Sequence, residues 1–180
     1  MKKEERETLS DTLLEASRQM LADQGRPLDV AGEDVPHSEI SGAIIASIGL
    51  SGPRGLRGAL VLVGLPACFR SLYPAELTAD PRSDAMADWA SEMANQLLGR
   101  IKNLLSRHGT DFSMGIPTLV RGDRLSVIGW DRPSSVSHSF RVGAHSLDVC
   151  LEMERVGSET LFDTEGEVVE TSPEGTALLF

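Results

Sequence analysis

Two strand-like segments joined by a very short turn constrain the fold of this chain more than any other feature. Residues 40–50 are rich in β-branched side chains and contain too much glycine for a good helix. Ser51-Gly-Pro-Arg-Gly55 is a turn signal, and the strand pattern resumes from Leu56 to Leu65. Short turns of this kind join antiparallel strands. The sequence therefore predicts a β-hairpin, and with it an antiparallel sheet.

Two long segments with helical periodicity accompany the hairpin. Residues 5–24 repeat apolar side chains at helical spacing and stop at Gly25-Arg26-Pro27. The second helix is expected from Ser83 to Arg107, with acids and a proline near its start and His108-Gly109 at its end. A short helix is predicted within residues 66–77, with its end around Tyr73-Pro74. Residues 28–38 carry glycine, proline and acids and are interpreted as an irregular connection.

The second half of the chain reads mainly as strands between glycine- and proline-containing turns. Gly122-Asp123 is a predicted tight turn between two of them. The four predicted strands are Thr118–Val120, Arg124–Trp130, Val136–Val142 and Ser146–Arg155. The fold class that follows is α+β, an antiparallel sheet with two long helices packed on it. We expect one domain over residues 1–155. Residues 156–180 form an acidic C-terminal extension, in which Glu165–Glu170 is a candidate further strand and partial disorder is the alternative.

Charge and composition exclude several classes of function. The 180 residues carry a net charge of −10, which disfavours binding to a phosphate backbone, so no nucleic-acid partner is expected. No apolar run approaches the roughly 20 residues of a membrane span. The charged N-terminus also lacks the apolar run of a signal peptide, so we expect a cytoplasmic protein without membrane association. Cys68 and Cys150 lie in apolar segments and are interpreted as buried, reduced thiols.

No metal site is expected, because the four histidines are scattered without a ligand spacing. They are His37, His108, His138 and His145. The glycine-rich stretch 51–58 lacks the Gly-Lys-Ser/Thr of a phosphate-binding loop and fits a hairpin turn better.

A polar stripe on the second long helix carries the functional signal. Asp88, Glu92, Asn95 and Gly99 are spaced four, three and four residues apart, so they line one face of a helix. The apolar stripe lies on roughly the opposite side. It consists of Met86, Ala90, Met93, Leu97, Ile101 and Leu104. Glycine in a helix interior costs about 1 kcal/mol relative to alanine. Close approach of a partner is one reason to find Gly99 there.

This pattern resembles the CheC/CheX/FliY chemotaxis phosphatases. Their motif is Asp or Ser, three residues, Glu, two residues, Asn, then 22 residues and Pro. This chain reads Asp88-Trp-Ala-Ser-Glu92-Met-Ala-Asn95, and Pro117 stands 22 positions after Asn95, which leaves 21 residues between them, one fewer than in the motif. The hairpin and the segments around Gly99 and Pro117 are also similar, so that the resemblance covers about residues 39–125. A single intact motif makes the chain resemble CheX more than the two-site CheC.

The resemblance implies a phosphatase that hydrolyses the aspartyl phosphate of a CheY-like response regulator. Glu92 and Asn95 would be the catalytic residues, Asp88 and Gly99 would contact the partner, and Pro117 would be a structural part of the motif. The protein would need no cofactor of its own, because the Mg²⁺ is held by the partner's acids. A phosphorylated CheY-like receiver domain is the implied partner, and a homodimer is implied as well.

Two other interpretations use the same residues. The fold could serve as a non-catalytic adaptor or sensor that docks a receiver or a flagellar-switch partner through the same helix face. Alternatively, the chain could be a dimeric scaffold, with that face buried in a self-interface. The first helix also contains Asp11-x3-Glu15-x2-Arg18, with arginine at the position of the asparagine. This is either an inactive second copy of the motif or chance.

Overall fold

The computed structural model describes residues 1–25, 29–33, 42–74, 83–125, 132–157 and 160–162. Within these ranges seven strands form one sheet in the order β1-β6-β7-β3-β2-β4, and β5 also pairs with β2. All of the pairings are antiparallel. The elements are α1 (Lys3–Asp23), β1 (Asp29–Glu33), β2 (Ala43–Ser51), η1 (Pro53–Gly55), β3 (Leu56–Gly64), α2 (Pro66–Ser71), α3 (Ser83–Ser106), β4 (Ser113–Met114), β5 (Thr118–Gly122), β6 (Ser135–Val142) and β7 (His145–Arg155).

The predicted hairpin is present as β2 and β3, paired from Ile44 with Gly64 to Ser51 with Arg57. Its turn is the single 3-10 turn η1, in which Arg54 and Gly55 adopt positive φ values of 56° and 72°. Glycine takes up this left-handed conformation without a steric penalty, which explains Gly55 at the turn. The hairpin lies near the middle of the sheet, where β3 pairs with β7 and β2 pairs with β4 and β5.

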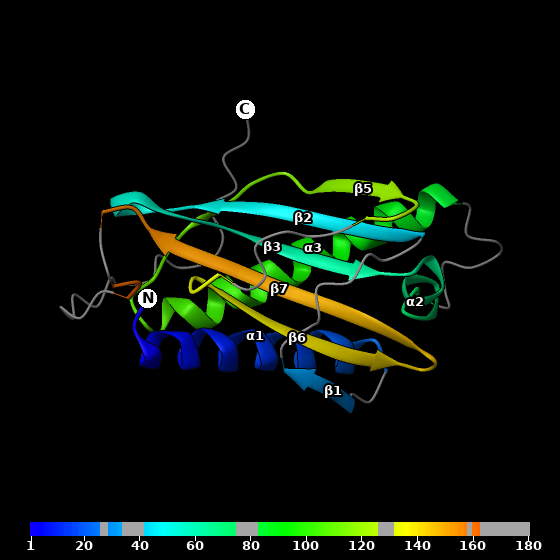
Figure 1. The fold of residues 1–180 in the computed structure, drawn as a ribbon, viewed down its shortest axis with the longest axis horizontal. Helices are drawn as coiled ribbons and strands as arrows, with labels where there is room; N and C mark the ends of the chain where they lie inside the picture. Colours follow the sequence, from blue (N-terminus) through cyan, green and yellow to red (C-terminus); the bar gives the residue numbers. More distant parts are fainter. Residues whose placement is uncertain (26–28, 34–41, 75–82, 126–131, 158–159, 163–180) are drawn as a thin grey trace, which may run out of the picture.

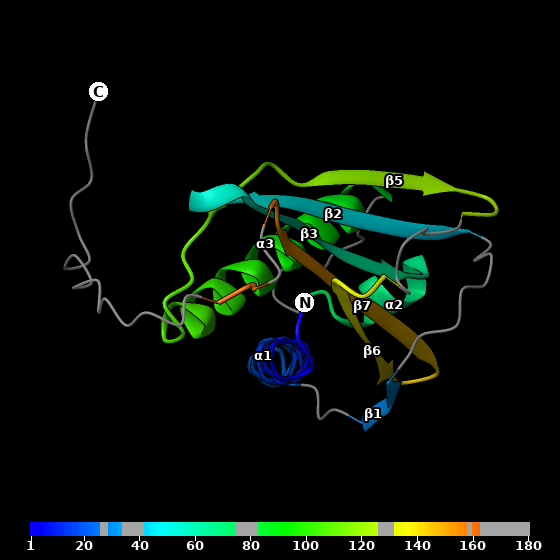
Figure 2. The same cartoon turned by 60° about the vertical axis from the view of Figure 1, so that its left-hand side comes forward.

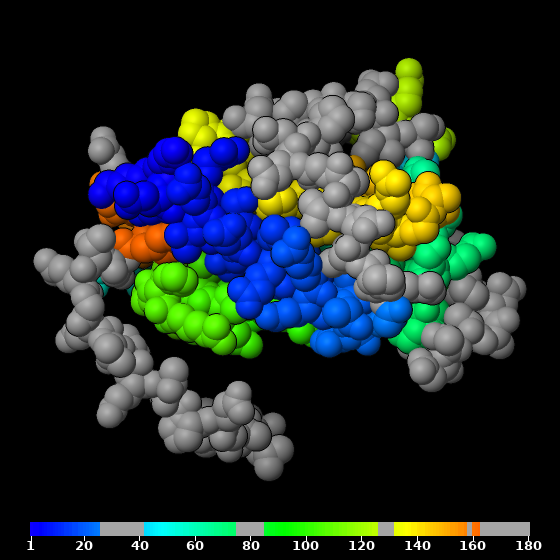
Figure 3. Space-filling view, turned by 90° about the horizontal axis from the view of Figure 1, so that it is seen from below, coloured from blue at the N-terminus to red at the C-terminus, as the bar shows by residue number. Residues whose placement is uncertain are grey.

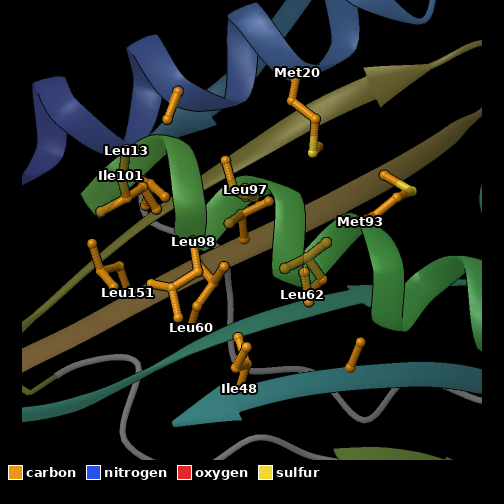
Figure 4. Packing of buried hydrophobic residues seen from close by; sticks show 14 of the residues in the cluster. Leu13, Met20, Ile48, Leu60, Leu62, Met93, Leu97, Leu98, Ile101 and Leu151 are labelled. Carbon is orange, nitrogen blue, oxygen red and sulfur yellow. The ribbon is translucent and has the colours of Figure 1, made fainter. Parts of the chain in front are cut away.

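Helices α1 and α3 lie side by side on one face of the sheet (Figures 1 and 2), with α3 packed on β2 and α1 on β6. Between the helices and the sheet is the main apolar core, to which both helices and the central strands contribute. Figure 4 shows Leu97 and Leu98 of α3 pointing into this core beside Leu60 of β3 and Leu13 of α1. The α+β fold class with two long helices on an antiparallel sheet is confirmed.

The predicted helices 5–24 and 83–107 are found as α1 and α3, and the predicted strands 136–142 and 146–155 as β6 and β7. The interpretation of residues 28–38 as an irregular connection was wrong for 29–33, which form β1. This strand pairs with β6 at the sheet edge, with a register shift between Val30 and Gly32. Its short sequence, Asp-Val-Ala-Gly-Glu, has no strand signal of its own.

Three predictions lie partly or wholly outside the described residues. Strand 124–130 is described only to Leu125, and Arg124 has a positive φ of 66° after the end of β5. The predicted strand 165–170 and most of the C-terminal extension are not described. The single-domain boundary at residue 155 therefore stays a prediction.

Residues 160–162 connect the start of α1 to the region after α3. The carboxylate of Glu5 accepts hydrogen bonds from the amides of Lys2, Leu161 and Phe162 at 2.8, 2.6 and 3.2 Å. Burial alone would raise the pKa of Glu5, but these hydrogen bonds outweigh it and hold the pKa below its usual value. The Phe162 ring also contacts His108, with centroids 5.8 Å apart. In Figure 3 this orange segment lies beside blue α1 and green α3.

Gly58 is expected to be essential for the pairing of β3 with β7. A Cβ atom at this position would overlap the backbone carbonyl oxygen of Glu152, which cannot move away without disrupting the sheet. We expect Gly58→Ala to lower the free energy of unfolding by about 2 to 3 kcal/mol. Gly49 on β2 is a matched control, because its added Cβ would lie 4.0 Å from the nearest atom. Urea unfolding of both variants tests this, and equal midpoints would contradict it.

Candidate functional site

The apolar and polar faces of α3 are separated as the sequence predicted. All six residues of the apolar stripe are buried, with exposed fractions from 0% to 9%. Ala94, Leu98 and Leu105 extend this buried face. Because the buried face is wide and continuous, α3 is held along its length against the sheet and α1. The opposite face is therefore presented in a fixed orientation.

Asp88, Glu92 and Asn95 are exposed on this opposite face, and the structure brings them together with Gly99. Eleven residues separate Asp88 from Gly99, which corresponds to about 16 Å along a helix. Glu92 Oε1 accepts a hydrogen bond of 2.8 Å from Gln96 Nε2, one turn further on. An exposed pair of this kind orients the carboxylate without burying it. The face therefore presents a carboxylate and an amide, one turn apart, to any molecule that docks on it.

Open space surrounds Gly99. A Cβ atom built at this position would have no heavy atom within 4 Å, outside its own stretch of helix and its chain neighbours. Packing inside the protein thus does not require a glycine at position 99, whereas it does at position 58. The helix accepts glycine's low propensity at a position where alanine would fit. This leaves a shallow gap in the polar face directly after Asn95.

Pro117 belongs to a different element. It is partly buried between β4 and β5, both of which pair with β2, the strand that α3 covers. The Gly115 amide donates a hydrogen bond of 2.8 Å to the Gly49 carbonyl of β2, and Thr118 pairs with Ser47. The register thus places Ile116 and Pro117 alongside β2 near Ile48. Proline suits this position between two short strand segments, because it fixes φ and needs no hydrogen-bond acceptor.

The two cysteines and His138 are buried inside the protein. Cys68 and Cys150 are free and buried, as predicted, and burial raises the pKa of each thiol to about 12. They are therefore not reactive thiolates. His138 is buried against α1, where its Nε2 lies 3.0 Å from Ser10 Oγ. Among the described residues no group of three or more His, Cys, Asp or Glu could hold a metal ion. His37 lies outside those residues.

The weaker motif on α1 also faces solvent. Asp11, Glu15 and Arg18 are all exposed, and Glu15 accepts a hydrogen bond of 3.0 Å from Gln19. This arrangement is similar to that of Glu92 and Gln96 on α3. The amide of Asn95 has no equivalent, because arginine occupies that position.

The polar stripe of α3 continues beyond Gly99. The same three- and four-residue spacing continues from Gly99 to Lys102 and Ser106. Lys102 is partly exposed and Ser106 is exposed. The continued spacing was itself the signal that locates Lys102.

Comparison with known proteins identifies the family. The sequence model of the family described as Chemotaxis phosphatase CheX matches residues 44–138, more than half of the chain. The chain belongs to this chemotaxis phosphatase CheX family. The match includes Asp88, Glu92, Asn95 and Gly99 on α3 and also Pro117. No curated protein matches the chain in a sequence search.

Solved structures share the fold at low sequence identity. The chain is similar to a putative chemotaxis protein from Desulfovibrio vulgaris Hildenborough, with a TM-score of 0.68 and 18% identity over 81% of this chain and 96% of that one. Chemotaxis protein CheX from Vibrio vulnificus matches with a TM-score of 0.67 and 18% identity over 81% and 99%. The CheX-CheY-BeF3-Mg²⁺ complex from Borrelia burgdorferi matches with 0.57 and 15% over 82% and 96%. The CheC/CheX-like fold is thereby confirmed.

No helix in the described part of the chain is long and apolar enough to cross a membrane.

Proposed function

We propose that this protein is a phosphatase that hydrolyses the aspartyl phosphate of a CheY-like response regulator in a chemotaxis or related two-component pathway. The observation that carries the proposal is the fixed, exposed presentation of Glu92 and Asn95 on one face of α3, next to the open space at Gly99. Membership of the chemotaxis phosphatase CheX family supports it. A CheX structure with the same fold forms a complex with CheY, BeF3 and Mg²⁺.

Asn95 would position the attacking water. In the reaction, the water oxygen bonds to phosphorus as the bond between phosphorus and the aspartyl oxygen breaks, releasing inorganic phosphate and a free carboxylate. An acyl phosphate is already reactive, so correct placement of the water in line with the leaving oxygen supplies much of the acceleration. The Asn95 amide both donates and accepts hydrogen bonds and carries no charge that would repel phosphate. It is not a base, and a loose transition state requires little base catalysis.

The remaining residues would hold the receiver in place. Glu92 would pair with a lysine near the receiver's phosphorylation site and so orient the partner. Asp88 would contact the partner further toward the start of α3, and Pro117 would shape the adjoining β4–β5 segment. The phosphatase would supply no metal, since the acids of the receiver hold Mg²⁺. The cytoplasm, where receivers act, is the proposed location. Homodimerisation also stays a prediction.

Phosphate release from phosphorylated CheY-like receivers of the source organism tests the proposed function. Added protein is expected to accelerate release at a rate proportional to its concentration. If the protein binds a receiver but does not accelerate phosphate release, the adaptor interpretation would hold in place of the phosphatase. If the protein neither bound nor dephosphorylated any receiver, and the α3 face were protected in a self-association assay, the scaffold interpretation would hold instead.

Glu92→Ala is expected to raise KM for the phosphorylated receiver about tenfold and to lower kcat as well. The variant loses a charge-assisted contact that both binds and orients the partner. Steady-state phosphate release over a range of receiver concentrations separates the two parameters. Glu15→Ala is a matched control, because Glu15 is an exposed carboxylate on α1 with the same type of glutamine contact. An unchanged KM for Glu92→Ala would argue against the lysine pairing.

A further inference from the structure

The polar face of α3 has an ordered distribution of charge. Asp88 and Glu92 place negative charge toward the start of the helix, Asn95 and Gly99 are uncharged, and Lys102 follows. Lys102 is seven residues after Asn95, which is almost two turns, so it lies on the same face about 10 Å further along the axis. Arg100, by contrast, points toward α1, where it pairs with Asp23 at 2.7 Å. The face therefore changes from acidic to basic across the catalytic amide.

Among the described residues, Lys102 pairs with an exposed carboxylate, that of Asp111. Its Nζ lies 3.2 Å from Asp111 Oδ1, and the two side chains are 37% and 75% exposed. Asp111 precedes β4 and also accepts a hydrogen bond of 2.8 Å from the amide of Phe112. Exposed ion pairs of this kind contribute little to stability, because water and salt screen the two charges. The pair is thus weak enough for a partner with a stronger anionic group to replace Asp111.

We propose that Lys102 is the cationic contact of the receiver-docking face, and that it exchanges Asp111 for the anionic rim of the receiver's phosphorylation site. The proposal rests on the proposed function. A receiver suits this face because it presents a lysine, which complements Glu92, and a phosphoryl group with carboxylates, which complement Lys102. The two contacts have opposite signs and lie on either side of Asn95. Together they permit one direction of docking along α3 and disfavour the reverse.

Steady-state phosphate release with Lys102 variants tests this orientation role. Lys102→Gln is expected to raise KM about threefold, and Lys102→Glu about tenfold, with kcat nearly unchanged, because a charge at the interface is lost or reversed. Lys102→Arg keeps the positive charge and should therefore keep the wild-type KM. The rise in KM of the other two variants should become smaller at high salt. Arg57→Gln is the matched control. Arg57 is an exposed cation on β3 that pairs with Glu154 at 2.6 Å, and its loss changes the net charge equally.

Asp111→Asn distinguishes partner binding from a structural role of the ion pair. If Lys102 contacts the receiver, removing its counter-ion frees it and lowers KM about twofold. If the pair only fastens α3 to the segment before β4, Asp111→Asn and Lys102→Gln should cause the same loss, which would overturn the inference. Equal KM values for wild type and Lys102→Glu would also overturn it. Titration with a beryllofluoride-loaded receiver gives the same ratios as dissociation constants, so the Lys102 inference is tested even if the wild type shows no turnover.

Discussion

Asn95→Ala is expected to lower kcat about 100-fold or more while KM changes by less than about twofold, because a positioned polar group that acts in the transition state is lost. Asn95 is exposed and supports no packing, so the fold should be unaffected. The docking contacts of Glu92 remain, so the variant should still bind the receiver. Single-turnover phosphate release measures the chemical step, and titration with a beryllofluoride-loaded receiver measures binding.

Asn103→Ala is the matched control for this prediction. Asn103 is also an exposed asparagine on α3, eight residues after Asn95 and one turn beyond Gly99. Its replacement should leave phosphate release at the wild-type rate. Equal rates for wild type and Asn95→Ala would refute the water-positioning mechanism. A parallel loss of receiver binding would instead show that Asn95 acts mainly in docking.

The elements that the sequence predicted well are those stabilised by their own local pattern. The apolar stripe of α3 repeats with a period of about 3.6 residues from Met86 to Leu104, about five turns, so the pattern predicted the buried face and the exposed face together. The hairpin was equally clear, because its turn lies between two segments with matching strand signals. By contrast, β1 forms only because β6 offers an open edge more than 100 residues away. No local signal reports that kind of pairing.

The residues of the candidate site also fall into two groups, those that the sequence could place and those that it could not. Helical spacing sufficed to place Asp88, Glu92, Asn95 and Gly99 on one face. The position of Pro117 required the sheet register, because its 22-residue separation from Asn95 says nothing about direction in space. The Lys102–Asp111 pair depends on how the chain returns from α3 to β4, which is again a tertiary feature. Contacts between distant segments were therefore the part that sequence could not supply.

Replacement of Gly99 is expected to raise stability and lower activity at the same time. Alanine relieves glycine's cost of about 1 kcal/mol in a helix interior, and leucine relieves nearly as much. Because a Cβ meets no neighbouring atom, no clash within the protein offsets this gain. Thermal unfolding should therefore show higher midpoints for Gly99→Ala and Gly99→Leu than for wild type.

Phosphate release should change in the opposite direction and in proportion to side-chain size. If the receiver approaches the helix closely beside Asn95, a methyl group reduces turnover about tenfold and a leucine about 100-fold, since misplacement by about 1 Å has effects of this size. Asn103→Ala again serves as control, because it raises helix propensity without filling the gap. A loss of activity in a more stable protein excludes unfolding as its cause. Wild-type turnover by Gly99→Leu would show that the receiver does not approach α3 at this level, and Gly99 would then lose its proposed role.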